Sequence, residues 1–272
     1  MPRRVPTAAV RSRAVHARTV HALGVPAMLL TALLVVVGCS TGADSRCRVD
    51  GPGSAAELTA LREACERALP VLAQVWPQWT GPAHIVPATE PLEPGTAARV
   101  EGIARPGAPA EGDRLVVAPD LTAAVDSAGL DVVLRHELTH LAMRATGTAS
   151  IPLWAAEGLA EHVGYASVPD ERRHRTEEVT RLRDRVAAGT WPGSVPSEDR
   201  LTDPGDRNDA YTAAWLGIEV LIAEHGLAAV TAAMQDPASG GESGLLTTLG
   251  ETPDTLTARW HEELVSRAAP VD

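Results

Sequence analysis

Residues 134–141 read Leu-Arg-His-Glu-Leu-Thr-His-Leu and contain the pattern H-E-x-x-H. Apolar residues in and around this stretch recur with a 3.6-residue period, which predicts a helix. Four residues turn a helix by about 400°, so His136 and His140 share one face, one turn apart. Two imidazoles placed in this way can bind one Zn²⁺ ion, with Glu137 beside the metal as a general base. The simpler interpretation is a helix that carries two surface histidines.

A second predicted helix begins near Pro152, a residue suited to a first helical turn, and carries Glu157. Catalytic zinc sites usually have three protein ligands and one open position for water, and two histidines with one glutamate are a known set. Glycine and proline between the two predicted helices let the chain turn and pack one helix against the other. The sequence therefore predicts Zn²⁺ bound by His136, His140 and Glu157.

The sequence H-E-L-T-H, followed from Pro152 by P-L-W-x-x-E-G-L-A-E, resembles the gluzincin zinc metallopeptidases of the peptidase MA-like branch. The resemblance covers residues 115–165 closely and the following residues more loosely. It implies an α+β fold: a mainly helical, zincin-like domain with a small N-terminal β-sheet before the H-E-x-x-H helix and a helical C-terminal lobe. It also implies an edge strand that binds an extended peptide by strand addition. Leu115-Val116-Val117 is the candidate edge strand, and a purely structural strand is the alternative.

The resemblance implies roles for two further residues. In thermolysin-like gluzincins, a carboxylate at the offset of Glu161 accepts a hydrogen bond from a ligand histidine and orients its ring; solvent exposure is the alternative. Tyr211 heads the pattern Tyr-x-x-Ala-Trp, which resembles the C-terminal lobe of the family. A tyrosine or histidine from that lobe often stabilises the oxyanion in related peptidases, and core packing is the alternative for Tyr211. His162 is expected to point off the face that carries Glu157. Four further histidines lack partners at ligand spacing and are expected to be ordinary: His84, His174, His225 and His261.

The first 38 residues resemble a bacterial lipoprotein signal peptide. Five arginines lie within residues 3–18, and no acidic residue precedes position 44. The uncharged run 22–38 has an apolar centre shorter than the roughly 20 residues that a spanning helix needs. It ends in Val-Gly-Cys-Ser, which resembles a lipobox and predicts lipidation of Cys39, although Val36 stands where leucine is usual. An ordinary signal peptide and an N-terminal membrane anchor are the alternatives.

The leader, 1–38, is followed by a predicted tether, 39–54, and by one metallopeptidase domain, 55–272. Within this domain we expect an N-terminal helix and small sheet (55–126), the metal-site helices (127–165) and a helical lobe (166–272).

Residue periodicity and turn signals predict the remaining elements. Helices are expected at 55–75, 170–188, 211–225, 227–234 and 253–268, and strands at 83–86, 97–103 and 114–118. The Pro- and Gly-rich stretch 105–113 is expected to be a hairpin loop, and 191–209 a lid or specificity loop. Ser127 is the expected cap of the H-E-x-x-H helix.

Cys47 and Cys65 are the other two of the three cysteines. In an exported protein they are expected to form a disulfide that pins the N-terminal tail to the first helix. The alternative is two unpaired thiols, since spacing alone does not decide geometry.

Net charge argues against a nucleic-acid partner. The chain has 24 basic and 35 acidic residues, and removal of the leader with its five arginines would leave 19 basic residues against 35 acidic ones. A surface this acidic repels nucleic acid.

Together these features predict a zinc-dependent peptidase, with endopeptidase action favoured, held by a lipid anchor on the extracytoplasmic face of a bacterial membrane. Its substrate would be a peptide or protein, cut by water whose proton Glu137 accepts. The alternative is a catalytically idle, peptidase-derived envelope lipoprotein that binds peptides or proteins. The intact Glu137 argues against this alternative, because metal binding alone does not require that base.

Overall fold

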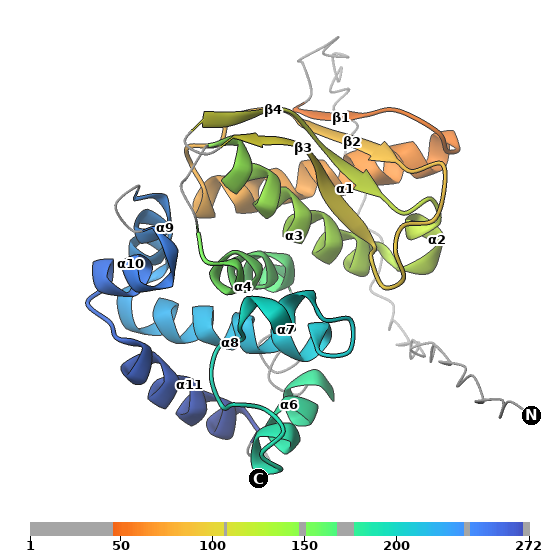
Figure 1. Ribbon diagram of the computed structural model, residues 1–272. Coiled ribbons are helices and arrows are strands. Elements are labelled where there is room, and N and C mark those ends of the chain that lie inside the picture. The colour runs from red at the N-terminus through yellow and green to blue at the C-terminus, as the bar shows by residue number, and fades with distance from the viewer. Residues whose placement is uncertain (1–45, 106–107, 147–150, 168–176, 237–239, 269–272) are drawn as a thin grey trace, which may run out of the picture. The chain divides into compact units, whose positions relative to one another are not determined.

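The computed structural model describes residues 46–105, 108–146, 151–167, 177–236 and 240–268 (Figure 1). The predicted leader, Cys39, the first part of the predicted tether and His174 lie outside these residues.

A four-stranded sheet forms the N-terminal part of the domain. Its strands are β1 (Cys47–Val49), β2 (Ala83–Pro87), β3 (Ala98–Arg105) and β4 (Ala108–Val117), in the order β1-β2-β4-β3. The pairs β1–β2 and β2–β4 are parallel, and β3 and β4 form an antiparallel hairpin. Burial alternates along β2, which indicates one packed face. The helices α1 (Ala55–Val75) and α3 (Ser127–Ala145) lie along that face (Figure 1).

The sheet differs from the sequence-based expectation in three places. β1 lies inside the stretch 39–54 that was expected to be a tether. β4 begins at Ala108, so much of the expected loop 105–113 is strand. β4 also pairs with β2 and β3 together, so the prediction of Leu115–Val117 as an edge strand is wrong, and that segment is a structural inner strand. The edge strand of the hairpin is β3.

Helix α1 has the predicted bounds, and its first turn explains why it begins there. Ser54 Oγ accepts a hydrogen bond from the Glu57 backbone N–H, and the Glu57 carboxylate accepts one from the Ser54 N–H, a reciprocal capping box. The buried face repeats every three or four residues: Leu61, Ala64, Cys65, Ala68, Leu72 and Val75.

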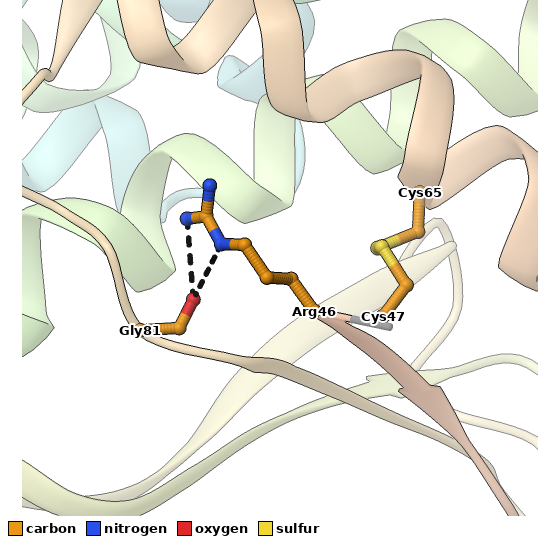
Figure 2. The surroundings of a disulfide bond; sticks show 4 residues. All are labelled: Arg46, Cys47, Cys65 and Gly81. Carbon is orange, nitrogen blue, oxygen red and sulfur yellow. Dashed lines mark hydrogen bonds between the residues drawn. A yellow bond between two sulfur atoms is a disulfide. The ribbon is translucent and has the colours of Figure 1, made fainter. Parts of the chain in front are cut away.

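A disulfide joins Cys47 of β1 to Cys65 of α1, with 6.0 Å between the two Cα atoms (Figure 2). Both cysteines are buried. Next to it, the Arg46 guanidinium donates hydrogen bonds to the Gly81 carbonyl, which fixes the chain just before β2 (Figure 2). The first strand is therefore held covalently to the first helix.

Two helices carry the predicted metal ligands. A short helix, α2 (Leu121–Ala124), precedes α3, and α4 (Leu153–Gly164) follows it and ends in the 3₁₀ turn Tyr165–Ser167. The cap of α3 is Asp126, whose carboxylate accepts a 2.8 Å hydrogen bond from the Gly129 N–H, so the prediction of Ser127 as the cap is wrong by one residue. Ser127 is instead the first helical residue.

The C-terminal lobe is built on one central helix, α8 (Arg207–His225), which contacts α4, α6, α7, α9 and α11 (Figure 1). The other helices of the lobe are α6 (Glu177–Ala187), α7 (Glu198–Thr202), α9 (Leu227–Gln235), α10 (Gly241–Thr248) and α11 (Pro253–Arg267). The expected loop 191–209 contains α7 and the start of α8, and α10 has no counterpart in the prediction.

Helices α4 and α8 approach closely because glycine lies at their contact. A Cβ atom built on Gly158 would lie 2.4 Å from the Ala214 carbonyl oxygen and 2.6 Å from Ile218 Cγ1. Real side chains do not tolerate such distances, so Gly158 permits this packing. The residue before it, Glu157, is thereby fixed against the core of the domain.

The predicted α+β class is confirmed, with the small sheet before α3 and helices after it. No single helix in the described part of the chain is long and apolar enough to cross a membrane; α8 and α9 meet such a test only as a pair, with a bend of 112° between them.

Candidate metal centre

Three predicted ligands converge between α3 and α4. His140 Nε2 lies 3.2 Å from His136 Nε2 and 3.1 Å from Glu157 Oε2, and His136 Nε2 lies 3.3 Å from the same oxygen. The two histidines are one turn apart on α3, and Glu157 comes from the facing side of α4. This metal triad is the one such cluster of three histidine, cysteine or carboxylate side chains within the described ranges.

The donor atoms of the metal triad fit zinc. Zinc binds nitrogen and oxygen ligands at about 2.0–2.2 Å, so two donors of a tetrahedral site lie roughly 3.3 Å apart or slightly more. The three distances of 3.1–3.3 Å are close to that spacing. Two imidazoles and one carboxylate are also a donor set that zinc commonly uses.

Glu161 lies where it can orient one ligand. Its Oε1 atom is 3.1 Å from Nδ1 of His136, on the side of the ring away from the metal triad. An N–H on Nδ1 that donates to this carboxylate leaves Nε2 with a free lone pair, which is the form that binds a metal. The side chain of Glu161 is 20% exposed.

The charges of the metal triad are strongly coupled. Burial disfavours the charged form of His136, but hydrogen bonds to Glu157 and Glu161 outweigh burial and raise its pKa well above the ordinary value. Burial would raise the pKa of Glu157, but the charge of His140 and hydrogen bonds from both histidines hold that pKa far below its usual range. Histidine binds a metal in its neutral form, so protons compete with a cation at this site.

Glu137 lines the same pocket as the metal triad, but its carboxylate is not one of the three converging donor groups. Burial raises the pKa of its carboxyl group, an effect that the neighbouring histidine charges oppose. A raised pKa makes a carboxylate a better proton acceptor near neutral pH.

Tyr211, in the second turn of α8, lies next to one histidine of the triad. Its ring stacks on His136 with 6.0 Å between ring centroids and an interplanar angle of 21°. Burial raises the pKa of its hydroxyl, so the group keeps its proton and stays a hydrogen-bond donor at neutral pH. The Tyr211 side chain packs against the core and also lines the pocket.

These residues form one wall of a pocket of about 690 Å³. Other parts of its lining were not singled out from the sequence: Ala98, Arg99 and Val100 of β3, Arg144 of α3, Leu201 of α7 and Arg207 of α8. No motif marks these positions. Two of these six residues, Leu201 and Arg207, come from the stretch 191–209 that was expected to be a lid or specificity loop.

The other four histidines whose positions the structure describes are not part of the triad. His84 pairs with Asp50, His162 with Glu219, and His225 with Glu251, at 2.6–2.9 Å. His261 is exposed. None of these four lines the pocket, as expected.

Comparisons of the chain with protein-family models, curated proteins and solved structures found no match. A function must therefore be inferred from the residues and their geometry.

Proposed function

We propose that this chain is a zinc-dependent peptidase of the gluzincin type, with a zincin-like domain and endopeptidase action favoured. The observation that carries the proposal is the convergence of His136, His140 and Glu157 on one wall of a pocket that Glu137 also lines. A structural zinc site requires four protein ligands. Only three donors converge here among the residues with described positions, and they face a pocket large enough for a peptide segment.

His136, His140 and Glu157 would hold the metal, and zinc supplies a lowered pKa for an attacking water and polarisation of the scissile carbonyl. Glu137 accepts the proton of that water and returns it to the nitrogen of the leaving amine. Tyr211, which keeps its proton, donates a hydrogen bond to the oxygen that develops negative charge. Glu161 holds the ring of His136 in place through Nδ1.

The free edge of β3 supports a peptide substrate. The Ala118 N–H donates to the Ala97 carbonyl at 2.8 Å, so residues 97, 99 and 101 direct their backbone groups toward β4. Ala98 and Val100 then direct theirs toward the open edge, and both residues line the pocket. An extended peptide that pairs with them would lie beside the metal triad.

The test uses the purified domain with and without Glu137→Gln. We expect about one zinc per chain in both proteins, measured by atomic emission. Hydrolysis of a mixed peptide library should fall by about 10²–10⁴ in the variant, because that is the usual contribution of a positioned general base. Zinc-loaded wild-type protein that binds peptides but cleaves none would favour the idle binding lipoprotein. Equal cleavage by both proteins would remove Glu137 from the mechanism.

The location on the extracytoplasmic face of a bacterial membrane, with a lipid anchor on Cys39, stays a prediction from the sequence.

A further inference from the structure

Arg207 is a cation of the pocket that has no carboxylate partner among the residues that the structure describes. It lies in the first turn of α8, is half-buried and lines the same pocket as the metal triad. Its guanidinium forms no ion pair or hydrogen bond with any other residue in the described part of the chain. A half-buried guanidinium without a partner has lost part of its hydration, so an incoming anion would restore favourable contacts.

The acidic residues next to Arg207 in the sequence are already engaged elsewhere. Asp209 receives Arg181 Nε at 2.6 Å and Arg185 Nη1 at 2.7 Å, and Asp206 receives Arg200 Nη1 at 2.7 Å. These contacts tie α6 and α7 to the start of α8. The fold therefore satisfies both aspartates with other arginines and leaves Arg207 to the pocket.

Arg207 also lies close to Tyr211 and, through it, to the metal triad. It precedes Tyr211 by four residues, so the two side chains leave α8 on the same face, with about 5–6 Å between their Cβ atoms. The Tyr211 ring is 6.0 Å from that of His136. An extended peptide advances about 3.3 Å per residue, so a chain bound at the triad reaches Arg207 within roughly three residues.

Two other arginines among the described residues line this pocket, and each contacts a carboxylate that the fold supplies. Arg144 makes a two-pronged contact with Asp113, at 2.8 and 3.1 Å, and Arg99 donates to Glu101 at 2.7 and 3.0 Å. Glu101 also accepts a hydrogen bond from Arg114 Nη2 at 3.0 Å, so Arg99 shares its carboxylate, whereas Arg207 has none among the described residues. Arg99 is thus a matched control for Arg207: the same residue type in the same pocket, with its partner supplied by the fold.

We propose that Arg207 is a carboxylate-binding subsite that selects substrates with an anionic group within about three residues of the scissile bond. A planar guanidinium binds a carboxylate through two parallel hydrogen bonds, which no neutral side chain can match. The carboxylate belongs either to an Asp or Glu side chain or to the substrate C-terminus. The inference rests on the proposed function, since it names the substrate class of the same pocket.

The experiment measures binding instead of turnover, in zinc-loaded Glu137→Gln protein. The probes are fluorescein-labelled Ala/Ser peptides with one Glu or one Gln at each position in turn, each made as a C-terminal acid and as an amide. We expect the best Glu peptide, or the acid form, to bind about tenfold more tightly than its neutral partner by fluorescence anisotropy, as one charge-assisted pair predicts. The Glu-scan and the acid–amide comparison distinguish the two sources of the carboxylate.

Adding Arg207→Gln should abolish this discrimination, Arg207→Glu should reverse it so that the Gln or amide peptide binds more tightly than its acidic partner, and Arg99→Gln should retain it. Circular dichroism melting identifies any variant that fails to fold, and Arg207→Lys, which keeps the charge, should then retain part of the preference. The inference is overturned if neutral and acidic peptides bind equally, if neither binds, or if Arg99→Gln removes the preference as fully as Arg207→Gln.

Failure of the proposed function has a different signature. Arg207-dependent binding of acidic peptides, together with a zinc-loaded wild type that cleaves none of them, would leave the subsite standing in a binding protein and reject the peptidase. Cleavage of peptides without a preference for acidic ones would support the peptidase and reject the Arg207 subsite.

Discussion

Acidic side chains flank the first turns of α8 in two groups with different partners. On one side, Asp206 and Asp209 meet the guanidinium groups of Arg181, Arg185 and Arg200 at 2.6–2.8 Å. The ring of Trp191 contacts two of these arginines. Its centroid is 5.1 Å from Arg185 Cζ and 4.6 Å from Arg200 Cζ. We refer to these six residues as the arginine cluster.

On the other side, Glu157 meets two histidines, and it forms no ion pair with an arginine among the described residues. Arginine carries a fixed charge, so the cations that face Asp206 and Asp209 require neither an added proton nor a metal ion. Histidine carries a charge only after it takes a proton, so the metal triad requires either a proton or a metal cation. The contrast supports the proposal that the metal triad binds a cation, whereas the arginine cluster joins α6 and α7 to the start of α8.

The largest effect should follow from removing a ligand histidine. His140→Ala takes away one of three donors, so the purified variant should lose stoichiometric zinc. Zinc at 100 times its Kd should raise the free energy of unfolding of the wild type by about 2.7 kcal/mol and leave that of the variant unchanged. Metal analysis and denaturant unfolding with and without a chelator measure both effects.

Glu157→Gln sharpens the same comparison, because its amide oxygen can still coordinate without the charge. It should therefore weaken zinc binding less than His140→Ala does. Full zinc occupancy in His140→Ala would remove that histidine from the ligand set.

A smaller effect is expected from Glu161→Gln. The carboxylate at 3.1 Å from His136 Nδ1 orients the ring and increases the basicity of the other nitrogen. Loss of such a partner typically weakens metal affinity by about 10–100-fold. A competition titration against a chromogenic zinc chelator measures the change, and an unaltered affinity would assign Glu161 to solvent exposure alone.

The smallest effect concerns the arginine cluster. Asp209→Asn keeps the side-chain volume but removes the charge that Arg181 and Arg185 contact, and both arginines are partly exposed. After allowance for solvent screening, the free energy of unfolding should fall by about 1 kcal/mol. Zinc affinity should not change, and a loss of zinc in this variant would contradict the division between the two groups.

Much of the candidate site could be predicted because it depends on spacing within helices. The four-residue intervals His136–His140 and Glu157–Glu161 fix which side chains share a face, whatever the rest of the fold. The bounds of α1 were equally accessible, since Ser54 and Glu57 form a local capping signal. Such features require only neighbours along the chain.

Features that depend on distant pairing were not predictable. β1 has three residues in a polar stretch, too short to show periodicity, and pairs with β2 more than thirty residues later. The residues from Ala108 have weak strand propensity and become a strand because β3 lies opposite. Arg207 looks in the sequence like one charge among several aspartates. Only the three-dimensional pairing of Asp206 and Asp209 with other arginines leaves it without a partner in the described part of the chain.

The disulfide between Cys47 and Cys65 determines where mechanical tension enters the domain. A strand of three residues such as β1 could be peeled from β2 by a modest pull on the preceding chain. The covalent bond instead transmits the force from residue 47 into the middle of α1, a helix of 21 residues packed against α3. If the preceding chain is tethered to a membrane, as its sequence predicts, tension on the tether would therefore load α1 through the disulfide instead of separating β1 from β2.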